Sequence, residues 1–139
     1  MPHPLDRDDA RALGTAVIQI AAPRADSVRE ARRQVGDLTR ERLSGERRRD
    51  AMLLTSELVT NSVLHGGDGP ITVWAGMDGR RLRVEVHDQG QGLPPGRPSA
   101  VADRERRDGR GLQLVATLAD RWGHRRRPWA VVWFEIDLG

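Results

Sequence analysis

The stretch SELVTNSVLHGG, residues 56–67, places polar side chains on a helix face that should otherwise be buried. The helix is predicted from about Glu46 to Leu64, and at about 100° per residue one sector holds Leu53, Leu54, Leu58 and Leu64. Glu57, Asn61 and His65 fall in that same sector, at positions i, i+4 and i+8. An apolar stripe on the opposite side holds Met52, Val59 and Val63. The helix is therefore predicted to be apolar on two faces, one of which also carries an acid, an amide and an imidazole.

The carboxylate of Glu57 needs a partner in this position, because burying an unpaired carboxylate costs several kcal/mol. One interpretation is structural: Glu57 pairs with an arginine of the preceding helix, and Asn61 caps a loop. The other is a cavity over this face, in which Asn61 offers an oxygen to a hard cation and Glu57 accepts a proton. Mg²⁺ takes few protein ligands when substrate phosphates supply the others, so one amide would be enough. For His65 alone, a hydrogen-bonded histidine at the helix end is the favoured interpretation.

A second motif lies at the end of a strand predicted over Leu82–Val86. Alternate residues of this strand share an interior face, and by the period-two rule Asp88 points to that same side. Gly90 and Gly92 follow it. A turn-forming aspartate is one interpretation. The other is a buried carboxylate that accepts a hydrogen bond from an exocyclic amine, beside glycines that let a flat ring approach the backbone.

The third motif is DGRGL, residues 108–112, before a helix predicted to begin near Gly111 and to end near Ala119. Glycines such as Gly109 and Gly111 at a helix N-terminus expose free amides and the positive end of the helix dipole, which favours phosphate. Several arginines at this point could close over phosphates, namely Arg104, Arg106, Arg107 and Arg110.

The remaining elements follow from periodicity and turn residues: a strand over 15–20, a helix from Asp26 or Ser27 to about Leu43, a strand over 71–75, a long loop from Gly90 to Gly109 and a last strand over 131–138. A turn at Asp78-Gly79 joins the two middle strands. This order predicts an α+β fold, a two-layer sandwich with a mostly antiparallel sheet and helices on one face. Residues 1–11 are predicted to be a loose N-terminal arm, and residues 12–139 a single domain.

The composition excludes several classes of protein. All 23 basic residues are arginine, which removes the phosphate-loop lysine of Walker A NTPases and the strand lysine of ordinary protein kinases. The lack of cysteine excludes a thiol nucleophile and a cysteine zinc site. The net charge is only +3, and no stacking aromatic series accompanies the arginine clusters, so direct nucleic-acid binding is not expected. No window reaches the roughly 20 apolar residues of a membrane span, and no signal peptide is apparent, so a cytoplasmic protein without membrane contact is expected.

Taken together, in this order and with this spacing, the three motifs resemble those of the GHKL ATPases, the gyrase and histidine-kinase superfamily with the Bergerat nucleotide fold. Residues 56–66 look like the N box of that family, and residues 86–93 look like its first glycine box. Residues 109–115, followed by Leu118-Ala-Asp120, look like its second glycine box. Within the superfamily the likeness is to the small single-domain anti-sigma factor serine/threonine kinases.

The resemblance implies a role for each matching residue. Glu57 would be the general base, Asn61 the Mg²⁺ ligand and Asp88 the acceptor for the adenine amine of ATP. The nucleotide-binding set would be completed by His65, Gly90, Gly92, Gly109, Arg110, Gly111 and Leu112. Residues 93–108 would form a lid. The last strand of this family usually carries a threonine that supports adenine through water, and Val131 is expected at that point here, which would weaken adenine binding.

The function that follows is an ATP-binding anti-sigma regulatory factor that transfers the γ-phosphate of ATP to a serine of an anti-anti-sigma partner of the STAS type. The alternative is a non-catalytic, nucleotide-gated interaction module that binds a sigma factor or another regulator. Glu57 favours the enzyme, whereas Val131 and the arginine-rich lid favour the module. A detached histidine-kinase catalytic domain is disfavoured, because no dimerising helix pair with a phospho-accepting histidine precedes the fold. The resemblance also suggests a homodimer.

Overall fold

The computed structural model describes residues 15–20, 25–67, 69–90, 106–126 and 128–138. Its elements are, in chain order, β1 (Thr15–Ile20), α2 (Ala25–Thr39), α3 (Gly45–His65), β2 (Ile71–Met77), β3 (Arg81–Asp88), α5 (Arg106–Leu118), β4 (Arg121–Arg125) and β5 (Ala130–Asp137). The predicted N-terminal arm lies outside the described residues, and so do Gly92 and most of the predicted lid.

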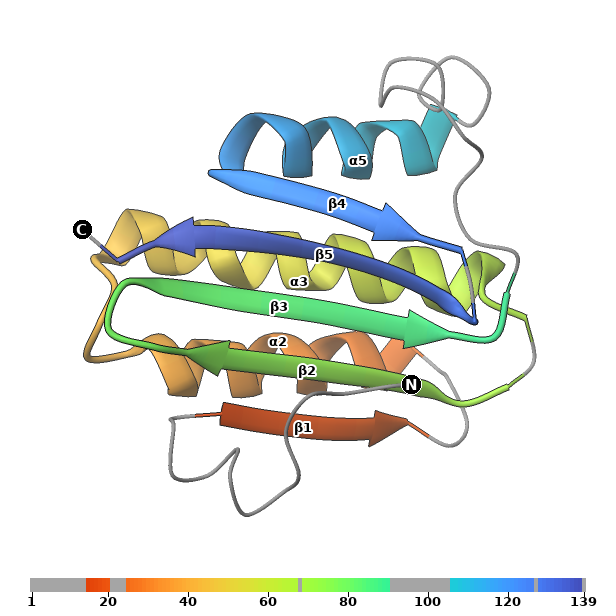
Figure 1. Cartoon of the computed structure of the whole chain (residues 1–139), viewed down its shortest axis with the longest axis horizontal. Helices are drawn as coiled ribbons and strands as arrows, with labels where there is room; N and C mark the ends of the chain where they lie inside the picture. Colours follow the sequence, from red (N-terminus) through yellow and green to blue (C-terminus); the bar gives the residue numbers. More distant parts are fainter. Residues whose placement is uncertain (1–14, 21–24, 68, 91–105, 127, 139) are drawn as a thin grey trace.

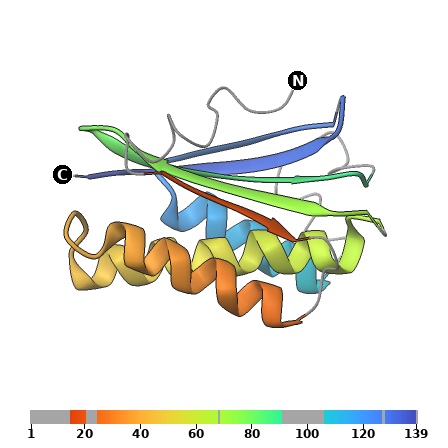
Figure 2. The same cartoon turned by 90° about the horizontal axis from the view of Figure 1, so that it is seen from below.

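The five strands form one sheet in the order β1-β2-β3-β5-β4, and every neighbouring pair is antiparallel (Figure 1). All three described helices cover the same face of this sheet (Figure 2). Antiparallel strands joined by short turns, with helices on one face, give a two-layer sandwich. The predicted α+β architecture is therefore confirmed.

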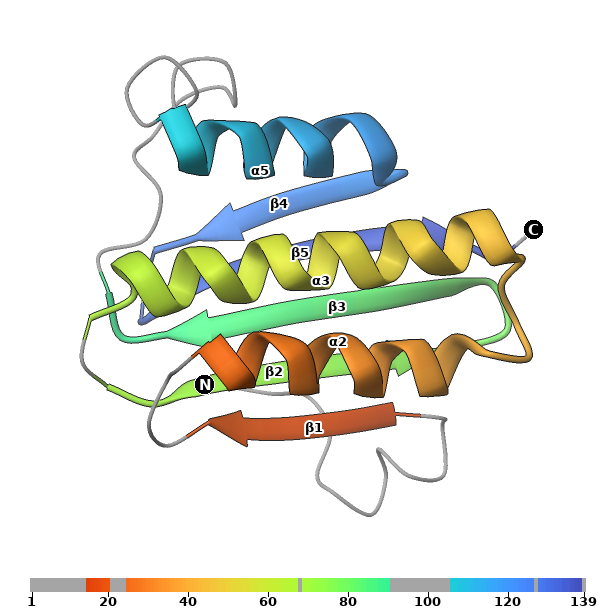
Figure 3. The ribbon, with the colours of Figure 1, turned by 180° about the vertical axis from the view of Figure 1, so that it is seen from behind.

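Helix α3 lies between α2 and α5 over the middle of the sheet (Figure 3). Its buried side is centred on Leu54 and Leu58, which are 0% and 2% exposed. Leu53 and Leu64 are instead 38% and 54% exposed, so their predicted burial is wrong. The four leucines fit one sector of a helical projection, but a helix with neighbours on both sides buries the sector that faces the sheet. Leu53 and Leu64 point away from that sector.

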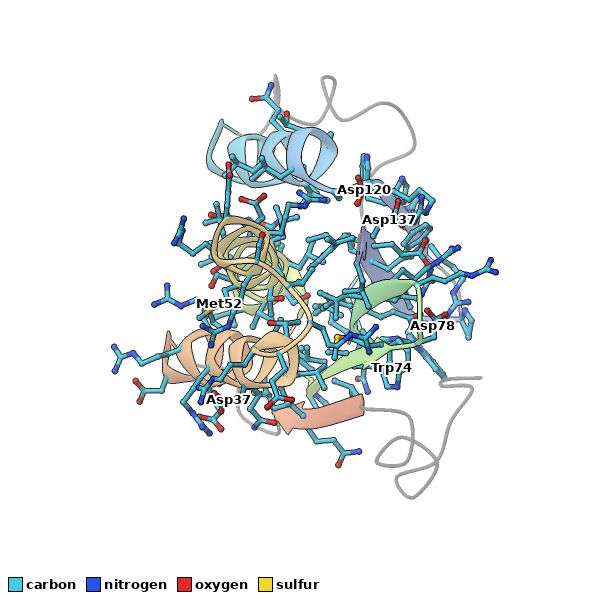
Figure 4. All side chains as sticks on the ribbon, turned by 90° about the vertical axis from the view of Figure 1, so that its left-hand side faces the viewer. Asp37, Met52, Trp74, Asp78, Asp120 and Asp137 are labelled. Atoms are coloured by element: carbon cyan, nitrogen blue, oxygen red, sulfur yellow. The ribbon has the colours of Figure 1, made fainter. Side chains whose placement is uncertain are left out.

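The flanks of α3 contact the two neighbouring helices. On one flank the side chain of Met52 packs at α2, where a Cβ added to Gly36 would lie 2.9 Å from its sulfur (Figure 4). Arg48 donates to the carbonyl of Gly36 from the same flank, at 2.8 Å. The other flank carries Glu57 and faces α5. The second apolar stripe predicted on this helix is thus the contact with α2.

Two helix boundaries differ from the prediction. Helix α2 ends at Thr39 rather than near Leu43, because the chain tightens into a turn there: the amides of Arg40 and Arg42 donate to carbonyls three residues back, at 3.4 Å to Asp37 and 3.1 Å to Thr39. Helix α5 begins at Arg106, five residues before the predicted start at Gly111. Residues 106–108 of the predicted lid therefore belong to a helix.

The sheet face that carries no helix holds a chain of charged and aromatic side chains. Trp129 Nε1–H donates to His87 Nδ1 at 3.0 Å, and His87 Nε2 lies 2.8 Å from the carboxylate of Glu85. Because an indole can only donate, Nδ1 of His87 is the acceptor, and the ring proton sits on Nε2. Arg83 donates to Glu85 at 2.6 Å and to Glu135 at 3.0 Å, and its guanidinium lies 4.1 Å from the ring centroid of Trp133.

This network predicts an acid-sensitive part of the stability. Burial by itself would raise the pKa of Glu85, but the hydrogen bonds from His87 and Arg83 lower that pKa to about 2. A carboxyl group whose pKa is depressed on folding stabilises the fold above its unfolded value near 4.5, and that contribution is lost as the pH falls from about 4.5 to about 2. Urea unfolding at pH 7, 4 and 3 is expected to show a smaller loss of stability on acidification in Glu85→Gln than in the unmodified protein. Parallel pH profiles for the two proteins would contradict this.

Candidate functional site

Glu57 projects from α3 toward α5 and is half-buried. A Cβ added to Gly111 of α5 would lie 2.6 Å from Glu57 Oε2, so the carboxylate rests directly against the α5 backbone. Among the side chains that the structure describes, none forms a hydrogen bond or ion pair with Glu57, and its predicted pairing with an arginine of the preceding helix is not observed. Burial raises the pKa of Glu57. An acid held in this way is a stronger base than an exposed carboxylate.

The contact with Glu57 changes the role expected for Gly111. In an α-helix only the first four N–H groups lack an intrahelical acceptor. Since α5 begins at Arg106, those groups belong to residues 106–109, and Gly111 is already inside the helix. Gly109 remains in the first turn, where free amides favour an anion. Gly111 is therefore placed to make room for the carboxylate of Glu57 rather than at the free N-terminal amides.

Replacing Gly111 with alanine is expected to affect the stability of the fold and the activity of Glu57 differently. The tight contact of the added methyl group would be with Glu57 Oε2, the far end of a flexible side chain, and alanine is favoured over glycine within a helix by up to about 1 kcal/mol. We expect a midpoint of urea unfolding that is unchanged or higher, together with a displaced Glu57 carboxylate and a loss of about tenfold or more in any reaction that uses it. Gly79→Ala, where an added Cβ meets nothing within 4 Å, is the matched control. Full activity in Gly111→Ala would show that the carboxylate position is unimportant.

Asp88 is the last residue of β3, and its carboxylate points to the helix side of the sheet. Ser62 Oγ of α3 donates to Asp88 Oδ2 at 2.6 Å, and the amide of Gly90 donates to Asp88 Oδ1 at 2.8 Å. The side chain is partly exposed, so each oxygen keeps an acceptor position for a further donor. The predicted inward direction of Asp88 is confirmed, and the bond to the Gly90 amide is the turn-forming contact that the alternative interpretation expected.

The C-terminal end of α3 meets the end of β3 without intervening side chains. A Cβ on Gly90 would lie 2.9 Å from the backbone of Gly66, and a Cβ on Gly66 would lie 2.7 Å from Asp88 Oδ2. Gly67 has a φ of 78°, which glycine adopts without strain. Three glycines, Gly66, Gly67 and Gly90, are thus needed where the first two motifs touch. Neither Ser62 nor Gly66 was among the predicted site residues, although both lie within the opening stretch.

The other predicted site residues take different places. Asn61 is half-buried and lies one helical turn beyond Glu57, on the same side of α3. His65 is the last residue of α3, and its side chain is exposed and engaged in an interaction. Leu112 is fully buried in the core. Arg110 lies in α5, but its side chain is outside the described part.

The position expected to support adenine needs correction. In the antiparallel register, Val131 is opposite His87, and Ala130 is opposite Asp88. Directly opposed residues share one face of a sheet. The side chain of Val131 therefore lies on the face without helices, away from Asp88, and Ala130 is the residue beside the carboxylate. Ala130 is 2% exposed and, like valine, has no hydroxyl group to hold a water.

The donor set fits a nucleotide better than a metal ion alone. Within the described residues, no group of three or more histidine, aspartate or glutamate side chains could hold a metal. A cation at Asn61 would therefore need most of its oxygen ligands from phosphate and water, which is how Mg²⁺ commonly binds. Asp88 and the first turn of α5 are the features that suit an amine and a phosphate respectively.

Comparison with known proteins identifies the family of this fold. Residues 21–134 match the family described as histidine kinase-like ATPase domain. Over 90 residues the chain is 38% identical to the sensor histidine kinase PdtaS of Mycobacterium tuberculosis, a match that covers 61% of this chain and 17% of that protein. PdtaS of Mycolicibacterium smegmatis is 37% identical over 81 residues, covering 55% of this chain and 15% of the relative. The chain thus spans less than a fifth of the length of these relatives.

Two solved structures share the fold. A chain of the SiaB–SiaC complex from Pseudomonas aeruginosa superposes with a TM-score of 0.61 at 13% identity, covering 94% of each chain. The histidine kinase domain of the blue-light activated kinase EL346 from Erythrobacter litoralis gives a TM-score of 0.53 at 22% identity, covering 81% of this chain and 60% of that one. Among the described helices, none combines the length and apolar character needed to cross a membrane. The match over most of its length shows that the chain belongs to the histidine kinase-like ATPase domains of the GHKL superfamily, a membership that implies ATP binding.

Proposed function

We propose that this domain is a protein serine/threonine kinase that uses Mg-ATP and acts as an anti-sigma regulatory factor. The observation that carries the proposal is the carboxylate of Glu57, which is half-buried, rests against Gly111 and has no described ion-pair partner. Burial raises its pKa, and a pKa nearer to neutral suits a general base. If Glu57 had only a structural role, such as holding two helices together, its carboxylate would be expected to have a cationic partner.

Three groups of the chain would bind the nucleotide. Asp88 accepts a hydrogen bond from the exocyclic amine of adenine, with Ala130 beside it in the register. Asn61 offers its amide oxygen to Mg²⁺, and the free amides at residues 106–109 face the phosphates. When bound, Mg²⁺ supplies positive charge that offsets the charge on the phosphates. Asn61 and Glu57 lie one turn apart on α3, so the same helix would position the metal and the base.

Glu57 would take the proton of a serine hydroxyl from a partner protein. The serine oxygen then forms a bond to the γ-phosphorus, and the bond between that phosphorus and the β,γ-bridging oxygen breaks. ADP leaves with the electron pair of the broken bond, and the proton remains on Glu57. The position of Glu57 against α5 keeps its carboxylate near the end of the phosphate-binding helix.

The proposed partner is a small anti-anti-sigma protein of the STAS type, and the proposed location is the cytoplasm. The named relatives support a signalling role, since they are sensor histidine kinases, and a structure with this fold occurs in a two-protein complex. A nucleotide-gated module that binds a sigma factor without phosphorylating it is the alternative, and the lack of a hydroxyl group at Ala130 favours it. A homodimer of the chain is also proposed.

Two measurements test the function in sequence. Calorimetric titration with ATP, with and without Mg²⁺, is expected to show magnesium-dependent binding. Incubation with γ-labelled ATP and each small STAS-type protein of the same genome should then label one of them on serine. Binding without label transfer to any of them would favour the interaction module. No binding at millimolar ATP would overturn the proposal.

A further inference from the structure

We infer that Ser62 is a positioning residue that makes the base pocket selective for a purine with an exocyclic amine over a purine with a keto group. The inference rests on the proposed binding of ATP at Asp88. Ser62 is 6% exposed, lies on α3 and reaches the end of β3, where its hydroxyl donates to Asp88 Oδ2 at 2.6 Å. The sequence motif that contains Ser62 does not predict this contact by itself, because the bond joins residues 26 positions apart in the chain.

Ser62 and the Gly90 amide together fix the carboxylate of Asp88. The hydroxyl occupies one position on Oδ2 and the amide occupies one on Oδ1, at 2.8 Å. A serine hydroxyl has a single proton, and here that proton is committed to Asp88. Toward a ligand, both Ser62 and Asp88 therefore present lone pairs only. The pair is an acceptor surface, which favours N–H groups.

The backbone around the pair leaves little room for it to rearrange. The amide of Gly66 donates to the carbonyl of Ser62 at 2.8 Å, and a Cβ on Gly66 would lie 2.7 Å from Asp88 Oδ2. Gly90 is packed against Gly66 on the other side. The carboxylate is thus held between the end of α3 and the turn after β3, and its orientation is set before a ligand arrives.

The consequence is discrimination between adenine and hypoxanthine. The two bases differ at position 6, where adenine carries an amine that donates and hypoxanthine a carbonyl that accepts. A carbonyl oxygen facing two acceptors loses its hydrogen bond and meets like partial charge, and a site built for a donor rejects such an analogue strongly. If the hydroxyl of Ser62 is removed, one of the two bonds that hold Asp88 is lost, and its carboxylate is freer to rotate away from the orientation that faces an amine.

The test is calorimetric titration of the whole chain with ATP and with ITP. In Ser62→Ala we expect the Kd for ATP to rise about tenfold and the Kd for ITP to change less than about threefold, so that the ATP preference falls. Ser56→Ala is the matched control, because the Ser56 hydroxyl donates to the carbonyl of Met52 in its own helix at 3.1 Å. It should leave both affinities unchanged. Ser62→Cys, which keeps the shape and weakens the donor, should give a smaller shift in the same direction if Ser62→Ala does not fold.

The remaining outcomes overturn the inference in distinguishable ways. Equal weakening of ATP and ITP in Ser62→Ala would mean that the serine supports the fold and does not select the base. Unchanged affinities in Ser62→Ala, with ATP binding still lost in Asp88→Asn, would refute the role of Ser62 and leave the proposed function intact. Absence of ATP binding in the unmodified protein would refute both.

Discussion

Replacing Glu57 with glutamine is expected to lower phosphoryl transfer by about 10²- to 10⁴-fold, the range that a positioned general base contributes. Glutamine has nearly the same shape and can still rest against Gly111, but its amide cannot accept the proton of a serine hydroxyl. Affinity for ATP should change little, because Glu57 is not among the groups proposed to bind the adenine, the phosphates or Mg²⁺. The measurement is transfer of labelled phosphate to the partner under single-turnover conditions, beside a titration with ATP.

The stability of Glu57→Gln provides a second check. Burial raises the pKa of Glu57, so the ionised form is disfavoured by the fold, and removing that charge should leave the stability unchanged or increase it. The raised pKa of Glu57 also sets the pH dependence of phosphoryl transfer. Transfer needs the ionised carboxylate, so activity is lost as the pH falls through a pKa above the ordinary 4.5. Glu41→Gln, at an exposed position after α2, is the control. Transfer at the unmodified rate in Glu57→Gln would exclude Glu57 as the base.

Asp88→Asn is expected to weaken ATP binding by about 100-fold, which corresponds to the loss of a charge-assisted hydrogen bond in a fixed geometry. The carboxylate accepts from Ser62 and from the Gly90 amide at once. An asparagine has one acceptor oxygen, so in either orientation its NH₂ group must face one of those two donors. The substitution therefore disturbs both the presentation of an acceptor to adenine and the turn after β3.

A loss of binding in Asp88→Asn must be separated from a loss of folding. Circular dichroism and urea unfolding of the variant are expected to show an intact fold with stability reduced by about 1–2 kcal/mol. Asp78→Asn, in the exposed turn between β2 and β3, is the matched control for an aspartate that holds backbone amides, those of Arg80 and Arg81. ATP binding of normal affinity in Asp88→Asn would remove Asp88 from the site.

Much of the architecture was accessible from the sequence. The strand over Thr15–Ile20 was predicted with the observed bounds, and the helix that carries Glu57 and Asn61 to within one residue at each end. These elements have clear periodicity and clear boundary residues, such as Ser44 before α3 and Gly66-Gly67 after it. The inward direction of Asp88 followed from alternation along β3.

Other predictions failed because periodicity gives spacing and not orientation in space. The leucines of α3 suggested a buried sector that includes Leu53 and Leu64, but the sheet and two flanking helices decide which sector is buried. The residue that supports adenine was expected at Val131, but the pairing of β5 with β3 places Val131 opposite His87 and Ala130 opposite Asp88. That register depends on the contact between two strands, which local spacing does not give. The start of α5 was placed at a glycine, although the helix begins at Arg106.

By itself, the sequence determined the order of strands and helices, the polar residues on α3 and the acid at the end of β3. Those features depend on neighbours within a few positions, whose spacing is fixed by helix and strand geometry. Only the tertiary structure decided that Ser62 bonds to Asp88, that Glu57 rests against Gly111 and that Ala130 stands opposite Asp88. Each of these contacts joins elements far apart in the chain, so it depends on how α3 packs against α5 and on how β5 pairs with β3, which no local pattern encodes.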